Sequence, residues 1–202
     1  MNPSPAVVVL AAGRGSRFDG PGHKLAQAFG ESSVLGTTLS AVLASGLPMV
    51  VVTVEALVAE AARIVARRDI VVLPAAEVQR AGMARSIVAG VSARSDAPGW
   101  LIHPADMPLV RPETFRAVAA ALPGQASVVA HFGGRRGHPV GFSAEMFSEL
   151  LELTGDEGAR RLLLRYPSRV LELDDRGILI DIDTQADLQD ARGRLAVPGA
   201  LP

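Results

Sequence analysis

The sequence predicts a doubly wound α/β fold, in which helices cover both faces of an open, mostly parallel sheet. Residues 6–11 (AVVVLA) and 48–54 (PMVVVTV) are short runs rich in valine, as buried parallel strands are. Segments of strand and helix character then alternate as far as residue 122, which is the order that right-handed crossovers produce. Signals for antiparallel pairing come later, so we expect a small antiparallel addition near the C-terminal part.

The elements of the first part each have a local signal. The apolar residues of 34–43 recur at helical spacing, and Gly46 supplies a stop. The helix expected after residue 111 has proline in its first turn, where the missing N–H costs nothing. The predicted order is strand 6–11, helix 34–43, strand 48–54, helix 57–67, strand 70–73, helix 83–93, strand 100–103 and helix 112–122.

The later part has a different pattern, in which strands pair through turns. The turn at residues 174–177 (DDRG) predicts a hairpin between the strands on either side of it. Thr184 is a suitable cap for a closing helix. The predicted order is strand 126–131, strand 138–142, helices 144–153 and 158–164, hairpin strands 169–173 and 178–182, and helix 184–195.

Composition narrows the class of protein. The 202 residues are 49% apolar and 20% charged, so the chain can form one globular domain with a full core. A net charge of −1 offers no broad basic field, which argues against a nucleic-acid partner. The lack of cysteine excludes disulfides and thiolate sites. The apolar run 6–12 is too short to span a membrane and lacks a basic leader, so we expect a cytoplasmic protein without a membrane partner.

A glycine-rich basic loop follows the first strand. Gly13 and Gly15 allow the backbone to turn and bring its N–H groups near an anion, while Arg14, Arg17 and Lys24 add three positive charges. In open α/β sheets, ligands bind at the carboxyl ends of the strands. A triphosphate needs this combination of backbone donors and cations. The other interpretation is a solvated basic loop that only connects two elements.

Two familiar nucleotide motifs do not fit this loop. A dinucleotide-binding turn requires a third glycine where Phe18 stands. A P-loop requires Gly-Lys followed by Ser or Thr, whereas Lys24 follows His23 and precedes Leu25. The loop therefore predicts triphosphate binding of another kind.

Carboxylates stand at two further points where elements end. Asp106 follows the strand 100–103 and is well placed to hold Mg²⁺, which prefers oxygen ligands, although Asp is also common in turns and caps. Asp181 and Asp183 fall on the same side of the expected last strand, where one could face the site and the other could cap the helix. His103 at a strand end is interpreted as structural.

Taken together, these motifs resemble those of the MobA-like nucleotidyltransferases, and within them most of all the molybdopterin cytidylyltransferases. The resemblance covers residues 7–188 and rests first on LAAGxGxR at 10–17 with Lys24 downstream. It implies a Rossmann-like nucleotidyltransferase fold, with Arg17 and Lys24 on the phosphates. It also implies that Ala12 is compatible with cytosine. The histidine at position 23 departs from the family pattern. The nucleotide-binding residues expected are Leu10, Ala11, Ala12, Gly13, Arg14, Gly15, Arg17, Lys24, Gly82 and Ser86.

The resemblance also assigns the remaining motifs. It implies that Asp106 is the magnesium aspartate and that the element at 181–184 approaches the metal, for which we favour Asp183. The segment GMxxS, with Gly82 and Ser86, would lie against the nucleobase at a helix start whose N–H groups are free. RGHP and GDxGAR surround the acceptor side in the family, and each of these residues also has an ordinary structural interpretation. The acceptor-binding residues expected are Arg136, His138, Asp156 and Arg160.

The function expected is transfer of a nucleotide, CMP from CTP, to a phosphorylated acceptor such as molybdopterin. Arg17, Lys24 and Asp106 would be catalytic, with Mg²⁺ as cofactor and a molybdoenzyme or its chaperone as a possible partner. We expect one domain over 1–202, with a nucleotide-binding half at about 6–110 and an acceptor-side half at about 111–195. Alternatives are GTP or another triphosphate with a different acceptor, a nicotinamide-dependent oxidoreductase, and a non-catalytic cofactor-delivery protein.

Overall fold

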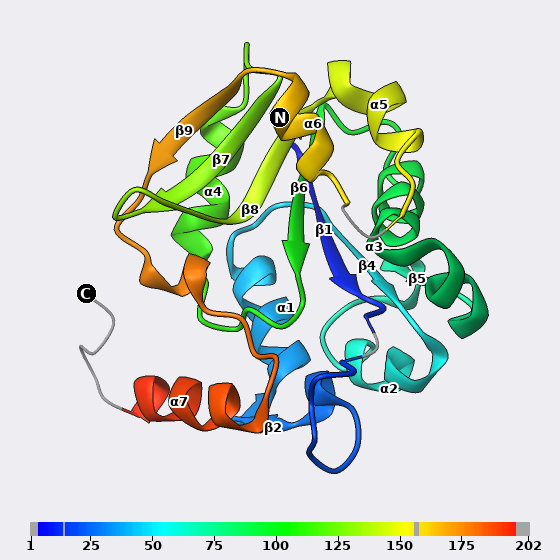
Figure 1. Ribbon diagram of the computed structural model, residues 1–202, viewed down its shortest axis with the longest axis vertical. Helices are drawn as coiled ribbons and strands as arrows, with labels where there is room; N and C mark the ends of the chain where they lie inside the picture. Colours follow the sequence, from blue (N-terminus) through cyan, green and yellow to red (C-terminus); the bar gives the residue numbers. More distant parts are fainter. Residues whose placement is uncertain (1–3, 14, 156–157, 197–202) are drawn as a thin grey trace.

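The centre of the protein is one seven-stranded sheet (Figure 1). The computed structural model describes residues 4–13, 15–155 and 158–196. Pairing is parallel except along one strand, which runs against both of its neighbours. This confirms the predicted mostly parallel sheet. In spatial order the strands are β5 (Ile70–Val72), β4 (Met49–Thr53), β1 (Ala6–Ala11), β6 (Gly99–Pro104), the reversed β8 (Arg135–Ser143), β7 (Ser127–Phe132) and β9 (Ser168–Glu172).

Two apolar cores lie on the two faces of the sheet, because successive side chains of a strand point to opposite sides. In β1, Val7 and Val9 belong to one core and Val8 to the other. The first core is covered by α1 (Val34–Ala44), α2 (Val58–Ala61), α4 (Pro112–Ala121) and α7 (Gln185–Ala196). The second is covered by α3 (Ala75–Ser92), α5 (Phe147–Leu151) and α6 (Arg160–Arg165).

The predicted hairpin over 169–182 is wrong. β9 pairs in parallel with β7, and Arg176–Leu179 form the 3-10 turn η5 in place of a strand. The cause is Asp175, whose buried carboxylate accepts hydrogen bonds from the Gly177 N–H at 2.9 Å, the Arg111 N–H at 2.9 Å and the Thr114 hydroxyl at 2.6 Å. These bonds fasten η5 to the start of α4, more than sixty positions away in the sequence.

Other boundaries differ more modestly. The helix expected over 57–67 is reduced to α2 between two 3-10 turns, η2 (Glu55–Leu57) and η3 (Arg67–Asp69), because Ala66 is extended and leads the chain toward β5. A two-stranded pair, β2 (Ala28–Phe29) with β3 (Ser32–Ser33), was not predicted. Within α3, Gly82 has φ 62° and ψ −158°, so the helix restarts at Met83 where the prediction placed its beginning.

The closing helix begins as predicted. The Thr184 hydroxyl accepts the Asp187 N–H at 3.2 Å, while the Asp187 carboxylate accepts the Thr184 N–H at 2.7 Å. This reciprocal pair is a capping box, and it fixes the chain just before α7. α7 lies beside β2 (Figure 1), where Arg192 donates to the Ala28 carbonyl at 2.6 Å.

Candidate functional site

The site is built on the loop between β1 and the 3-10 turn η1 (Lys24–Ala26), called here the glycine loop (residues 12–23). Gly15 has φ 61°, a conformation that favours glycine. A Cβ at Gly15 would lie 3.1 Å from Cγ of Lys24, so the loop folds back until its start meets the stem of the lysine that follows it. Arg14, predicted to bind the nucleotide, lies outside the described residues.

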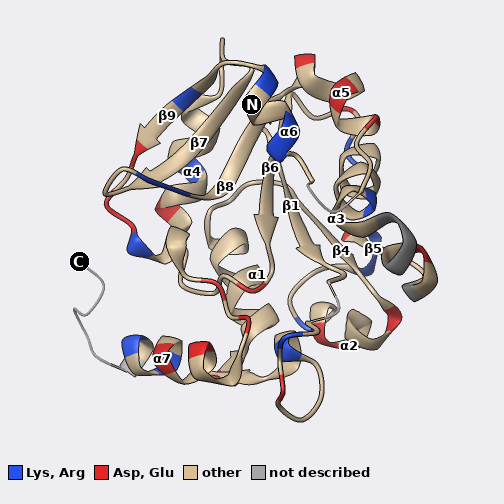
Figure 2. Cartoon of the chain, in the orientation of Figure 1, with Lys and Arg blue, Asp and Glu red and all other residues tan. Residues whose placement is uncertain are grey.

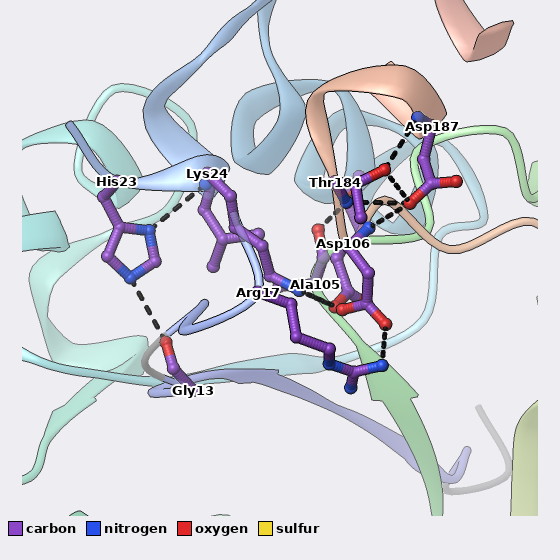
Figure 3. Close-up of polar contacts among 11 residues, drawn as sticks. Gly13, Arg17, His23, Lys24, Ala105, Asp106, Thr184 and Asp187 are labelled. Carbon is purple, nitrogen blue, oxygen red and sulfur yellow. Dashed lines mark hydrogen bonds and ion pairs between the residues drawn. The ribbon is translucent and has the colours of Figure 1, made fainter. Parts of the chain in front are cut away.

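The end of the glycine loop is held by His23, the residue that departs from the family pattern. Its Nδ1 accepts the Leu25 N–H at 3.1 Å, and its Nε2 lies 3.2 Å from the Gly13 carbonyl oxygen (Figure 3). Burial lowers the pKa of His23, and the positive charge of Lys24 lowers it further, against the opposing effect of the Gly13 carbonyl. The imidazole therefore joins the two ends of the loop in its neutral form.

Lys24 is the centre of the charged cluster. Its Nζ donates to Asp106 Oδ2 at 2.7 Å and to Asp183 Oδ1 at 2.9 Å, and its side chain is only 8% exposed (Figure 3). Arg17 Nη1 reaches the other oxygen of Asp183 at 2.7 Å from a side chain that is 75% exposed. Burial alone would lower the pKa of Lys24, but the two carboxylates outweigh it and the pKa is raised. The ammonium group thus lies charged between two carboxylates.

The backbone of Ala105 and Asp106 is hydrogen-bonded to three other segments of the chain. The Ala105 N–H donates to the Leu10 carbonyl at 3.1 Å, which ties the segment to β1. The buried Thr38 hydroxyl of α1 donates to the Ala105 carbonyl at 2.9 Å. The Asp106 carbonyl accepts the Ile182 N–H at 2.9 Å. The Asp106 carboxylate is therefore aimed by a rigid frame.

The second carboxylate segment lies against the first. The Asp183 N–H is accepted by Asp187 at 3.1 Å, so the cap of α7 also positions Asp183. Asp181 lines the same cleft as Asp183 and Asp106. Burial raises the pKa of Asp181, and the negative charges of Asp183 and Asp106 add to the rise. Of the two candidates for the second ligand, Asp183 is the one that contacts Lys24.

Three adjoining clefts lie at this edge of the sheet, and residues of the charged cluster line two of them. The first is lined by the glycine loop together with Lys24, Asp106 and Asp183. The middle cleft adds Asp181 and the start of β8. The third is a cavity of about 400 Å³ with mostly apolar walls from β6, β8, α3 and α6. Met83 lines all three, and the middle cleft shares further lining residues with each of the others, so the three lie side by side and are together called the groove.

The predicted acceptor residues meet at this third cavity. Arg136, His138 and Arg160 all line it, although they come from β8 and α6. Figure 2 shows positive residues both at the start of β8 and on α6. Burial lowers the pKa of His138, and its Nδ1 is buried without a hydrogen-bond partner among the described residues. Asp156 lies outside the described residues.

Some of the residues predicted to bind the nucleotide line the first cleft, and others are buried away from it. Leu10, Gly13, Gly15, Arg17 and Lys24 line the first cleft. By contrast, Ala11, Ala12 and Ser86 are buried. The helix start after Gly82 offers fewer free donors than expected, because the Ala84 N–H is bonded to the Gly155 carbonyl at 3.2 Å. His103 is fully buried against the ring of Phe115, as a structural histidine would be.

Sequence reasoning missed several residues of the groove. Met83, expected as the first residue of a helix, is 50% exposed and lines all three clefts just after the break at Gly82. Thr38 and Asp187 were not singled out, although they support the two carboxylates. The TxxD pattern at 184–187 is a signal that could have identified Asp187.

The donor set can be tested against a divalent metal. Within the described residues no group of three or more His, Cys, Asp or Glu side chains converges on one point. Two carboxylates do converge, and a cation, the Lys24 ammonium, lies between them. One or two carboxylates completed by substrate phosphates and water are the usual ligands of Mg²⁺. The residues therefore fit a metal that arrives with a triphosphate.

No helix among the described residues has the length and apolarity to cross a membrane.

Comparison with solved structures supports this view of the fold. Rv0371c from Mycobacterium tuberculosis H37Rv superposes with a TM-score of 0.81 and 30% identity, covering 94% of this chain and 98% of that chain. A manganese complex of Rv0371c superposes with a TM-score of 0.76 at 30% identity, covering 96% and 100%. The fold is therefore of the Rossmann-like nucleotidyltransferase class, with a charged groove at one edge of its sheet.

Sequence comparison gives the family. The MobA-like NTP transferase domain matches residues 7–170, and the chain belongs to this family. The purine catabolism protein PucB of Bacillus subtilis (strain 168) is 35% identical over 116 residues, 55% of this chain and 56% of that protein. The bifunctional protein GlmU of Corynebacterium aurimucosum is 27% identical over 207 residues, 97% of this chain and 42% of that protein. The chain thus spans about half the length of these curated relatives.

Proposed function

We propose that this nucleotidyltransferase moves CMP from CTP to a phosphorylated acceptor of the molybdopterin kind and releases pyrophosphate. The observation that carries the proposal is the position of the charged cluster. Lys24 and Arg17 meet Asp106 and Asp183 between the glycine loop on one side and the arginine-flanked cavity on the other. A triphosphate in the first cleft and an acceptor in the third would bring their phosphates together at this cluster.

The chemistry needs little from a general base. An acceptor phosphate is already an anion, and one of its oxygens forms a bond to the α-phosphorus while the bond to the pyrophosphate oxygen breaks. The obstacle is repulsion between two anions. Arg17 and Lys24 would offset this charge, and their fixed positions would orient the triphosphate. Asp106 and Asp183 would hold Mg²⁺, which when bound stabilises charge on the reacting phosphates.

The third cavity supports the proposed class of acceptor, a phosphorylated molecule with a ring system. Its walls are mostly apolar, as in small-molecule sites, and its volume of about 400 Å³ suits a compact ring system. Arg136 and Arg160 could pair with an anionic group of the acceptor. CTP is favoured by the resemblance at Ala12. GTP and ATP are the competing triphosphates.

The test measures pyrophosphate release from CTP, GTP and ATP with Mg²⁺, with and without molybdopterin. We expect release with CTP that depends on the acceptor. Asp106→Asn should lower turnover by about 100-fold or more, as loss of one electrostatic group in an active site does. Asp174→Asn, at an exposed position, is the matched control and should retain activity. Equal activity of both variants would reject the role of Asp106, and release with GTP alone would reject the preference for CTP.

A further inference from the structure

His23 connects the two ends of the glycine loop. Its Nδ1 faces the N–H of Leu25 in η1, and its Nε2 faces the carbonyl of Gly13 just after β1. Gly13 and His23 are ten positions apart in the chain, and Arg17 lies between them. One side chain therefore spans the base of the loop that lines the first cleft.

The two contacts determine the tautomer of the ring. A backbone N–H can only donate, so Nδ1 must carry a lone pair where it meets Leu25. A carbonyl can only accept, so the proton must be on Nε2, which donates to Gly13. A doubly protonated ring would place two donors against each other at Leu25. The clasp thus requires the neutral Nε2–H form.

We propose that neutral His23 is a positioning residue that closes the glycine loop and so presets its backbone donors and Lys24 for a triphosphate. The inference rests on the proposed function, since it assumes that this cleft receives the phosphates. Gly13 lines the cleft directly and Lys24 follows His23 in the chain, so opening the clasp would release both sides of the site. Loops that are fixed before binding lose less conformational entropy when the ligand arrives.

A simpler role must be separated from this one. Nδ1 of His23 also acts as the N-cap of η1, and a cap alone would support folding without shaping the cleft. His23→Asn distinguishes the two roles, because asparagine is a good N-cap but its short side chain cannot also reach Gly13. His23→Ala loses both contacts.

The experiment measures the affinity for CTP with Mg²⁺ by calorimetry, and thermal unfolding without ligand, for the wild type and both variants. We expect His23→Asn to unfold within a degree or two of the wild type yet bind CTP up to about tenfold more weakly, which is the upper end of what one neutral hydrogen bond contributes. His23→Ala should bind at least as weakly. If His23→Asn binds CTP as tightly as the wild type does, the residue is only a cap and this proposal is overturned.

A pH series adds a readout that a structural role would not change. The pKa of His23 lies below 6.5 because the ring is partly buried and because the positive charge of Lys24 is close to it. Lys24 is the charged group that acts on this ring among the described residues. As the pH falls through that lowered pKa, the wild type should lose its advantage over His23→Asn, while ionisation of the triphosphate affects both proteins alike. A ratio of affinities that stays constant from about pH 8 down to the lowest pH at which both proteins remain folded would overturn the clasp. Failure of the wild type to bind any triphosphate would overturn the proposed function as well.

Discussion

The ammonium group of Lys24 lies between the two carboxylates that are proposed to hold the metal, so Lys24 should affect how tightly a metal ion binds. Its Nζ is 2.7 Å from Asp106 and 2.9 Å from Asp183, and the side chain is almost fully buried. A bare divalent ion must compete with this ammonium group. A triphosphate, by contrast, offers Lys24 new anionic partners. We therefore predict that Lys24→Met, which keeps the length of the stem, will bind Mn²⁺ more tightly than the wild type when no nucleotide is present.

The size of the effect follows from Coulomb's law. Two unit charges about 4 Å apart interact by about 4 kcal/mol at the effective dielectric constant of a protein surface. Part of that is lost because the freed carboxylates become solvated, so we expect a gain of at least about 1.4 kcal/mol, or tenfold in affinity. Arg17→Met is the matched control. It removes the other cation on Asp183, but an exposed pair contributes only about 0–1 kcal/mol and Lys24 stays in place.

The assay is electron paramagnetic resonance of free Mn²⁺ during titration of each protein, with circular dichroism to verify folding. Tenfold tighter binding by Lys24→Met, with little change in Arg17→Met, is the expected result. Two results would refute the reasoning. One is an unchanged Mn²⁺ affinity in Lys24→Met, and the other is an equal gain in both variants, which would indicate a general charge effect.

Two further predictions concern stability, measured by urea unfolding. Asp175→Ala removes a buried acceptor of three hydrogen bonds, and at about 1.5 kcal/mol or more for each bond to a charged group we expect a loss of about 4.5 kcal/mol or more. Burial of His103, together with the nearby His138, lowers the pKa of His103 from 6.5 to about 3. The folded protein then binds fewer protons than the unfolded chain between these values, so stability falls as the pH drops below 6.5. At about pH 5 the cost is about 2 kcal/mol, and His103→Leu should remove it.

Each of the two stability predictions can be contradicted by a specific measurement. Asp174→Ala, at the exposed neighbour, should change stability by less than about 0.5 kcal/mol, and a similar value for Asp175→Ala would contradict the assigned hydrogen bonds. For His103, the quantity to compare is the difference in unfolding free energy between about pH 7.5 and pH 5. If that difference is the same in the wild type and in His103→Leu, the buried ring does not titrate as described.

The sequence was most informative where local pattern and position in the sheet coincide. The valine-rich strands are buried on both faces, so their composition alone identified β1 and β4. Parallel strands end at one edge, and this placed Lys24 and Asp106 near each other although eighty-two positions separate them. The capping residue Thr184 was visible because a threonine directly before a helical segment is a common N-cap.

Prediction failed where a distant partner decides the local structure. A DDRG turn between two apolar segments indicates a hairpin, yet the carboxylate of Asp175 is used by Arg111 and Thr114 of another element. Likewise, nothing near Met83 in the sequence indicates that it lines three clefts. Its direction depends on the positive φ of Gly82 and on the segments packed around it.

The reversed strand β8 has a consequence for how this scaffold can change. In the other six strands the chain runs toward the carboxyl edge of the sheet, whereas in β8 it runs away from that edge. The exposed turn at Gly133 and Gly134 therefore lies at this edge, and β8 leads from it to Arg136 and His138 in the wall of the third cavity. Under the proposed function, lengthening or recharging this turn would act on the acceptor side and leave Asp106 and Asp183 in place. A short surface segment could then change the preferred acceptor while the residues proposed for the triphosphate stay the same.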